Sequence, residues 1–276
     1  MKKSLFSILL VLLAFAVTAA DPAVPSAATV KLPTKDKFFL FILAGQSNMA
    51  GRGKIAPQDQ QVNPRVLTLN KDGQWVPAVD PIHFDKKLAG VGLGRTFGLL
   101  AAEKYPEVTI GLIPCACGGS SIKTWVPGGF HQQTHSYPYD DTLKRVKTAL
   151  AAGTLKGILW HQGEADISMK PEQYTARLLE LIARFRTEFN APDVPVIIGQ
   201  LGQFKPWGEG TKGINRAHLA AAAGVGNGAF VSSDGLTCNP DNIHFDAVSQ
   251  REFGRRYFAA WLKVAESSAG KADLKK

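Results

Sequence analysis

Apolar residues in this chain gather into short runs separated by longer segments of mixed polarity. The clearest run, Phe38 to Leu43, contains no polar side chain, as expected for a strand that is covered on both faces of a sheet. Four later runs have the same character and end at turn residues or at a loop. They cover residues 108–113, 156–160, 194–200 and 229–232.

Between these runs, apolar residues recur at intervals of three and four, which is the pattern of amphipathic helices. The segment that begins at Pro171 shows it best, because proline is favoured in the first turn of a helix. Strands that alternate with helices predict an α/β fold: a mostly parallel sheet of about five strands with helices on both faces. The expected helices cover about 94–104, 141–152, 171–189, 214–223 and 246–266.

One pair of short apolar runs departs from this alternation. Residues 65–69 and 75–79 flank the turn sequence Asn70 to Gly73, a spacing that predicts a β-hairpin. We expect this hairpin to be an excursion from the main sheet. The irregular stretch from Trp125 to Tyr139, rich in glycine, histidine and proline, is expected to be a substrate-binding loop.

The amino-terminal residues have the features of an export signal. Lys2 and Lys3 precede an apolar stretch from Leu5 to Val17, and small residues offer a cleavage site before Asp21. The apolar stretch is short for a membrane span, although a retained anchor is the alternative. We therefore predict that residues 1–20 are a signal peptide and that the protein is exported, to the periplasm or the cell exterior, without a stable membrane partner.

The remaining chain is expected to contain one domain. Residues 21–37, which include three prolines, are predicted to be a flexible leader. Residues 38–267 carry the alternating strands and helices and show no linker or internal repeat, and a chain of 276 residues is long enough for one sizeable core. Residues 268–276 are predicted to be a basic tail.

The chain is basic, but the distribution of its charge does not indicate a nucleic-acid partner. The formal charge is +9, and removal of Lys2 and Lys3 with the signal leaves +7. No run of basic residues is interleaved with aromatic ones, so we expect no nucleic-acid partner. Much of the charge is consistent with a solvated surface, and attraction to an acidic polysaccharide is the weaker alternative.

Three cysteines, Cys115, Cys117 and Cys238, do not have the spacing of a zinc site, so no metal and no cofactor are expected. In an exported protein a disulfide is a reasonable expectation. It would join Cys115 or Cys117 to Cys238, because both segments are predicted to lie at one edge of the sheet. The alternative is that the cysteines are buried thiols, and only geometry decides between the two.

Four polar patches stand where the predicted topology would bring them together, each after a strand or in the closing loop. Because the carboxyl ends of parallel strands meet at one edge, where open α/β sheets bind ligands, these patches define a candidate site. They are Gly45 to Asn48, Gly118 to Ser121, His161 to Glu164, and Asp241 to His244.

The first and last patches contain the groups that nucleophilic acyl transfer requires. Ser47 offers a hydroxyl, and His244 is the best placed of the six histidines to act as its base. Asp241 precedes His244 by three residues, so that in a turn its carboxylate can reach the imidazole Nδ1 and orient the ring. A capping or turn role for Asp241 is the alternative.

The two middle patches offer donors for the oxyanion that forms during acyl transfer. The backbone N–H of Ser47 can supply one donor, and the N–H of Gly119 a second, because a glycine allows close approach of the main chain. The side-chain amide of Gln162 can supply a third. A simple tight turn is the alternative role of the paired glycines.

Taken together, the four patches resemble the sequence blocks of the SGNH (GDSL-like) hydrolase superfamily. Within it, the similarity is to the sialate O-acetylesterase-like enzymes and the acetylxylan esterases of carbohydrate esterase family 6, and it spans roughly Lys37 to Leu262. The matching blocks are Gly45 to Met49, Gly118 to Ile122 followed by Trp125, His161 to Glu164 with Asp166 beyond, and Asp241 to Phe245.

The resemblance implies a three-layer α/β/α sandwich of flavodoxin-like type and metal-independent removal of acetyl groups from sugar hydroxyls. It makes Ser47 the nucleophile, His244 the base and Asp241 its partner. Glu164, which in some relatives is proposed as the acid, is an alternative acid or a substrate contact. Further substrate contacts are expected from Gln46, Asn48 and Trp125, the last by stacking on a sugar ring.

Other activities on the same fold are a lipase, a thioesterase or a catalytically weak carbohydrate-binding homologue. The long loop lacks the apolar lid of a lipase, and both Ser47 and His244 are present. An acetylated sugar or polysaccharide is therefore the expected substrate. Acetylated xylan, sialic acid and pectin all remain open, because specificity depends on loop shape.

Overall fold

The computed structural model describes residues 30–204 and 208–273. The predicted signal peptide, residues 1–20, and the leader as far as residue 29 lie outside the described residues. From Lys31 onward the described chain forms one unit. Within it, no helix is long and apolar enough to cross a bilayer.

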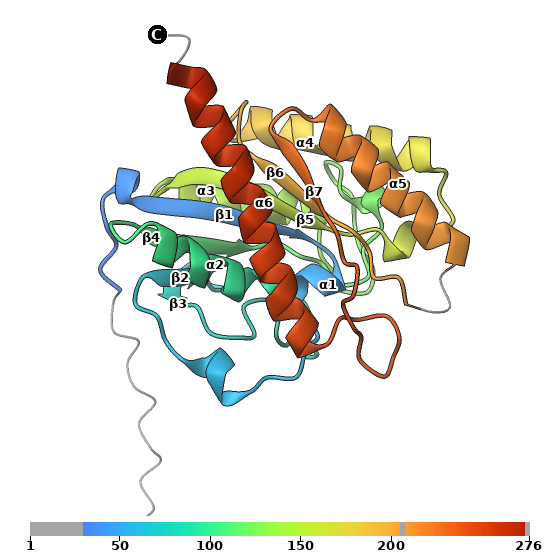
Figure 1. The fold of residues 1–276 in the computed structure, drawn as a ribbon. Helices are drawn as coiled ribbons and strands as arrows, with labels where there is room; N and C mark the ends of the chain where they lie inside the picture. Colours follow the sequence, from blue (N-terminus) through green and yellow to red (C-terminus); the bar gives the residue numbers. More distant parts are fainter. Residues whose placement is uncertain (1–29, 205–207, 274–276) are drawn as a thin grey trace, which may run out of the picture. The chain divides into compact units, whose positions relative to one another are not determined.

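Seven strands form a single sheet in the order β3-β2-β4-β1-β5-β6-β7 (Figure 1). All neighbouring pairs are parallel except β2 with β3. The predicted α/β fold is therefore confirmed, with more strands than expected. The strands are β1 (Phe38–Gly45), β2 (Val66–Leu69), β3 (Trp75–Pro77), β4 (Thr109–Pro114), β5 (Thr154–His161), β6 (Val196–Gly199) and β7 (Gly228–Val231).

The two additional strands come from the predicted hairpin. β2 and β3 do pair with each other as expected, but β2 also pairs in parallel with β4. The hairpin is therefore an extension of the main sheet and not an excursion from it. Local sequence predicts the antiparallel pair, whereas the pairing with β4 depends on the tertiary structure.

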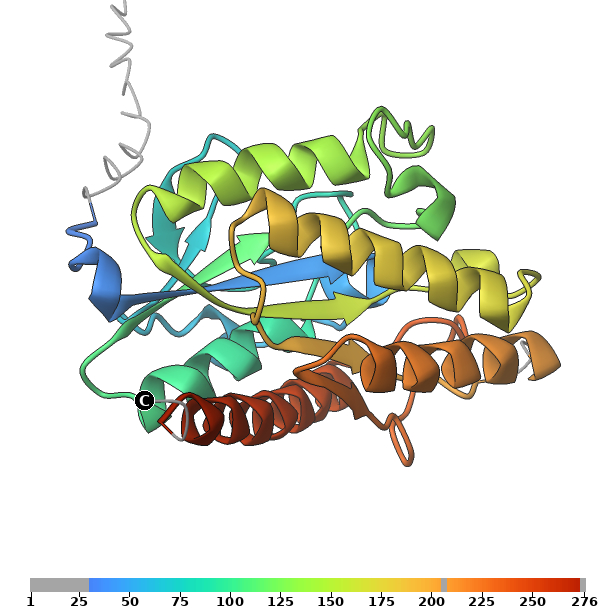
Figure 2. The same cartoon turned by 90° about the horizontal axis from the view of Figure 1, so that it is seen from above.

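Helices cover both faces of the sheet, which makes three layers (Figure 2). α2 and α6 pack on each other and on one face, while α3, α4 and α5 lie over the other face. The helices are α1 (Ser47–Ala50), α2 (Leu93–Lys104), α3 (Pro138–Leu150), α4 (Pro171–Glu188), α5 (Gly208–Gly224) and α6 (Ala247–Asp273), with short 3-10 turns η1 (Lys35–Lys37), η2 (Pro57–Gln60), η3 (Ile122–Thr124) and η4 (Glu164–Asp166).

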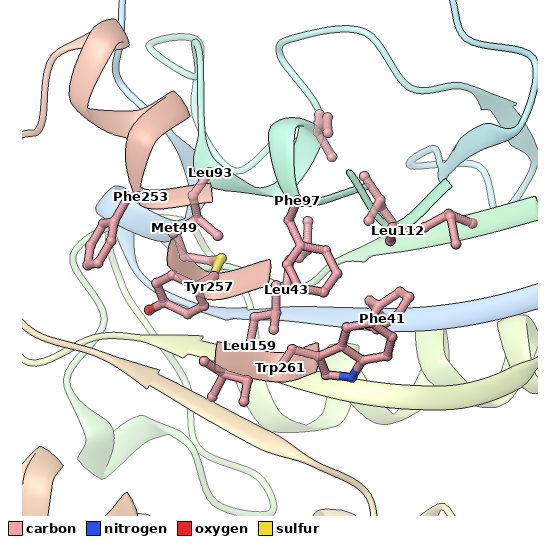
Figure 3. Packing of buried hydrophobic residues seen from close by; sticks show 14 of the residues in the cluster. Phe41, Leu43, Met49, Leu93, Phe97, Leu112, Leu159, Phe253, Tyr257 and Trp261 are labelled. Carbon is pink, nitrogen blue, oxygen red and sulfur yellow. The ribbon is translucent and has the colours of Figure 1, made fainter. Parts of the chain in front are cut away.

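The core on the α2 and α6 face is built around three aromatic rings (Figure 3). The ring centroid of Phe41 lies 4.8 Å from that of Phe97 and 5.0 Å from that of Trp261. Trp261 also donates its indole N–H to the Lys156 carbonyl at 2.8 Å, which satisfies its polar atom. Edge-to-face packing of this kind ties α2 and α6 to the central strand β1.

The end of β1 lies at the point where the order of the strands in the sheet changes direction. After β1 the chain builds β2, β3 and β4 on one side of it, and then crosses to build β5, β6 and β7 on the other side. In open α/β sheets, ligands bind outside the carboxyl ends of the strands at such a reversal. Ser47 stands directly after β1, at this point.

We expect Phe97→Ala to destabilise the protein by about 3–5 kcal/mol, because the substitution removes a fully buried ring and leaves a cavity against Phe41 and Trp261. Chemical denaturation measures the free energy of unfolding. Leu219→Ala, at a side chain that is 57% exposed on α5, is the matched control and should change stability by less than about 0.5 kcal/mol. Equal effects of the two substitutions would contradict this description of the core.

Candidate active site

A sharp turn at the end of β1 presents Ser47. Gly45 has a φ of 138°, and a Cβ atom at this position would lie 2.0 Å from the carbonyl oxygen of His161. The next amide, that of Gln46, donates to the same carbonyl at 2.9 Å. Only glycine permits this approach of β1 to β5. The chain can then turn into α1, with Ser47 as its first residue.

Ser47, His244 and Asp241 form a continuous hydrogen-bonded chain. The Ser47 Oγ lies 2.9 Å from Nε2 of His244, and Nδ1 of the same ring lies 2.7 Å from Oδ2 of Asp241. With the proton on Nδ1, the ring donates to the carboxylate and accepts from the serine hydroxyl. The structure therefore brings together the three residues that the sequence suggested, although Ser47 and His244 are 197 positions apart.

Asp241 also shapes the turn that carries the histidine. Its Oδ1 accepts the backbone N–H groups of Ile243 and His244, each at 2.9 Å. Partial burial raises the pKa of Asp241, but these amides and the His244 ring outweigh that effect and lower it below the ordinary value. The carboxylate therefore stays charged, as orientation of an imidazole requires.

Two backbone amides at the carboxyl edge of the sheet have no partner in the described part of the chain. The N–H groups of Ser47 and Gly119 make no hydrogen bond there. Gly119 has a φ of 85°, a left-handed conformation that favours glycine. The preceding amide, that of Gly118, donates to Oδ2 of Asp85 at 2.9 Å, which holds the loop in this shape. Free amides of this kind can stabilise an oxyanion.

The predicted third donor, Gln162, is not free to act on a ligand. Its side chain is completely buried, and Nε2 donates to Oδ2 of Asp166 at 2.7 Å and to the Ser120 carbonyl at 2.9 Å. Oε1 accepts the hydroxyl of Tyr174 at 2.7 Å. A buried amide must find partners inside the protein. Gln162 therefore joins the loops after β4 and β5, and the prediction of an oxyanion contact is corrected.

Gln46 and Asn48, predicted as substrate contacts, are also buried and engaged. Oε1 of Gln46 accepts the backbone amides of Gly163 and Ala165, each at 3.3 Å. Asn48 bonds to the segment around His244, because its Oδ1 accepts the Phe245 amide at 3.1 Å and its Nδ2 donates to the Ile243 carbonyl at 3.2 Å. Both side chains fix loops and do not face a ligand.

Glu164 contacts Asn48 and not His244. Its Oε1 accepts Nδ2 of Asn48 at 2.5 Å and lies 3.8 Å from Nε2 of His161. Burial raises the pKa of Glu164, but His161 and Asn48 together lower it below its ordinary value. The carboxylate is therefore ionised and holds the amide that positions the His244 segment, whereas Asp241 makes the contact with the imidazole.

Trp125, predicted to stack on a sugar ring, is only 1% exposed. Its indole N–H donates to Oγ of Ser120 at 3.0 Å, and its ring packs edge-to-face on Trp160. The prediction of a sugar contact is wrong, because the large apolar ring fills the core beneath η3 and finds its one polar partner there.

The expected disulfide does not form, since all three cysteines are free. Sγ of Cys117 lies 2.9 Å from Oγ1 of Thr134, whereas Sγ of Cys238 lies 3.8 Å from Oδ1 of Asn242. Burial raises the pKa of the Cys115 thiol to about 11, so it stays protonated and unreactive. Within the ranges that the structure covers, no cluster of side chains could hold a metal ion.

Sequence reasoning missed the ion pair that supports the Gly118 loop. Nη2 of Arg52 lies 2.8 Å from Oδ2 of Asp85, and both side chains are nearly inaccessible. Asn239, from the loop that precedes His244, donates to the Arg52 carbonyl at 3.0 Å. None of these residues lies in a recognisable motif, so no local pattern could have identified them.

Comparison with known families gives a match over most of the chain. Residues 37–263 match the family described as carbohydrate esterase, sialic acid-specific acetylesterase. A probable carbohydrate esterase from Arabidopsis thaliana is 32% identical over 245 residues, which cover 81% of this chain and 90% of the relative. The human sialate O-acetylesterase is 32% identical over 120 residues, but these cover 38% of this chain and 21% of that protein.

Solved structures show the same fold. The crystal structure of a protein from Arabidopsis thaliana superposes with a TM-score of 0.72 at 31% identity and covers 82% of this chain and 98% of that one. The crystal structure of a carbohydrate acetylesterase from Xanthomonas citri superposes with a TM-score of 0.66 at 19% identity and covers 84% of this chain and 57% of that one. The crystal structure of NanS superposes with a TM-score of 0.61 at 16% identity and covers 86% of this chain and 100% of that one.

We expect Asn48→Ala to lower kcat for ester hydrolysis about 10- to 100-fold with little change in KM, because the His244 segment loses both of its contacts with this side chain. Steady-state kinetics on p-nitrophenyl acetate give both constants, and circular dichroism checks that the variant is folded. Asn70→Ala, in the exposed turn between β2 and β3, is the control. An unchanged kcat in folded Asn48→Ala would contradict the positioning role.

Proposed function

Because the chain belongs to the carbohydrate esterase family described as sialic acid-specific acetylesterases, we propose that it removes O-acetyl groups from sugar hydroxyls through an acyl-enzyme intermediate on Ser47. The single observation that carries this assignment is the hydrogen-bonded chain from Asp241 through His244 to Ser47. The relatives named as carbohydrate esterase and sialate O-acetylesterase support an acetylated sugar or polysaccharide as the substrate.

In the first half of the reaction, Oγ of Ser47 attacks the acetyl carbonyl carbon while its proton passes to Nε2 of His244. The imidazolium that forms is stabilised by the Asp241 carboxylate, 2.7 Å from Nδ1. The tetrahedral intermediate then collapses and breaks the bond between the carbonyl carbon and the sugar oxygen. That oxygen takes the proton from Nε2, so a sugar alcohol leaves and the serine stays acetylated.

In the second half, water repeats the sequence at the acetyl-serine. Nε2 of His244 takes a proton from the water, whose oxygen attacks the carbonyl carbon. Collapse of the second tetrahedral intermediate releases acetate and returns the proton to Oγ of Ser47. No metal or redox group is needed to balance either half.

The negative charge that develops on the carbonyl oxygen needs hydrogen-bond donors already in position. We assign this role to the free N–H groups of Ser47 and Gly119. Each donor of this type typically contributes about 3–4 kcal/mol to transition-state stabilisation. The Asp85 carboxylate and the Arg52 guanidinium contribute by holding the Gly118 amide, and so the shape of the loop.

Export of the protein remains our proposal from the amino-terminal sequence. The two lysines, the apolar stretch and the small residues before Asp21 support a cleaved signal. An esterase in the periplasm or outside the cell would meet acetylated glycans as polymers or as fragments.

Ser47→Ala tests the proposed function directly. We expect it to lower kcat on p-nitrophenyl acetate and on O-acetylated sugars by about 10⁴-fold or more, because the attacking oxygen is lost. Acetate release is measured across acetylated xylan, sialic acid and pectin. Ser267→Ala, which removes an exposed hydroxyl on α6, is the matched control. If folded wild type releases no acetate from any of them, carbohydrate deacetylation is refuted.

Asp241→Asn and Glu164→Gln distinguish the two acids. Asp241→Asn should lower kcat about 10³- to 10⁴-fold, because the ring loses the charge that orients it. Glu164→Gln retains an oxygen for Asn48 and should lower kcat less than about 10-fold, as expected for an indirect effect on geometry. Steady-state kinetics of both folded variants at one pH give the ratio of their kcat values. The reverse order of losses would make Glu164 the acid of the mechanism.

A further inference from the structure

Three aromatic side chains are exposed together on the loop between η3 and α3. Phe130 is 42% exposed and Tyr137 is 46% exposed, and their ring centroids are 5.2 Å apart. The exposed ring of His135 lies 6.2 Å from that of Phe130. We call these three residues the aromatic cluster. Single exposed apolar residues are ordinary, but a group of exposed rings on one loop indicates a contact surface.

The loop that carries the aromatic cluster is firmly anchored. Its two ends donate backbone N–H groups to the first turn of α3, from Gly128 to Asp140 at 2.9 Å and from Tyr137 to Asp141 at 3.0 Å. In the middle, His131 and Ser136 exchange backbone hydrogen bonds of 2.8 and 3.3 Å. The rings are therefore held in place before any ligand arrives, which reduces the entropy that binding would cost.

The same loop contacts the segment that contributes the Gly119 amide. Nε2 of His131 lies 3.3 Å from the carbonyl oxygen of Gly118. Oε1 of Gln133 would lie 2.6 Å from a Cβ atom on Gly119. The aromatic cluster therefore belongs to a loop that packs, through His131 and Gln133, against the segment of the proposed oxyanion site.

From this arrangement we infer that Phe130 and Tyr137 form a binding subsite for a pyranose ring of the acetylated glycan. The inference rests on the proposed function and adds the surface that recognises the sugar. One face of a pyranose presents several C–H groups and no charge, so it packs on an aromatic ring, while hydroxyl groups at its edge remain free for hydrogen bonds. The Tyr137 hydroxyl and the His135 ring offer such partners.

This subsite replaces the role that sequence analysis gave to Trp125. Trp125 lies in the core, whereas the aromatic cluster lies on the surface a few residues further along the same loop. The subsite predicts that loss of the two rings affects large and small substrates differently. A glycan ester contacts both the catalytic residues and the cluster, whereas p-nitrophenyl acetate is small enough to need only the catalytic residues.

Kinetics on two substrates test the subsite. The double variant Phe130→Ala/Tyr137→Ala should raise KM about 10-fold or more for the O-acetylated oligosaccharide that wild type hydrolyses best, because two ring contacts are lost. Its kcat/KM for p-nitrophenyl acetate should change less than 2-fold. Phe130→Tyr retains both rings and the Tyr137 hydroxyl and should keep the KM of wild type within about 2-fold. Leu219→Ala is the control for loss of an exposed apolar group elsewhere.

Binding is measured separately by calorimetry in the Ser47→Ala background, where the oligosaccharide is not consumed. The double variant should weaken its Kd by the same factor as it raises KM. An unchanged Kd and KM in the double variant would overturn the subsite while leaving the proposed function intact. Equal losses on both substrates would also overturn it, because they would indicate distortion of the Gly119 loop. Failure of wild type on every acetylated carbohydrate, with p-nitrophenyl acetate still hydrolysed, would refute the proposed function itself.

Discussion

The whole site depends on the attachment of the last loop of the chain to the first strand, and Asn48 makes that attachment. Its side-chain amide bonds to the main chain of Ile243 and of Phe245, on either side of His244. Its own carbonyl accepts Nε2 of Gln250 at 3.0 Å. These contacts join segments about 200 positions apart in the sequence and determine where the imidazole stands relative to Ser47. The Asn239 side chain adds a second attachment of this loop, since it donates to the Arg52 carbonyl at 3.0 Å.

Glu164 supports this attachment through its contact with the Asn48 amide. An ionised carboxylate in a nearly dry position costs free energy unless it is paired, and here it is paired with the Asn48 amide and with His161. The short contact with Asn48 restricts the amide to one orientation, so that its oxygen faces the Phe245 N–H. A charge that does not touch the imidazole therefore contacts the side chain that holds the His244 segment, an indirect support of the kind found around precisely positioned side chains.

The sequence predicted those features that are local. Phe38 to Leu43 is a continuous apolar run, so its identity as a central strand was visible. Asp241 and His244 lie in one turn, so their contact followed from spacing alone. The meeting of Ser47 with His244 followed from the predicted order of strand ends, but prediction failed where buried side chains take their partners from other distant segments. The glycine-rich start of α5 shows no apolar period, yet Gly210 allows the helix to approach the Ile167 carbonyl, where a Cβ atom would come within 2.6 Å. Likewise, Gln46 and Gln162 follow strand ends, a position that suggested contact with substrate, whereas their amides satisfy one another and the surrounding backbone.

Under the proposed function and the proposed subsite, the chemistry of the site is separate from recognition of the sugar. Ser47, Gly119 and His244 are held by the strand ends and by buried amides, so their relative positions are tied to the core of the fold. The aromatic cluster is held by two carboxylates at the start of α3, independently of Asn48 and Glu164. Under the two proposals, changes in the cluster would alter which glycan binds without moving Ser47, because the loop meets the segment after β4 through side chains other than the two rings, among them His131, Gln133 and Thr134. Variation of a surface loop over a constant catalytic edge is how one α/β fold serves many substrates.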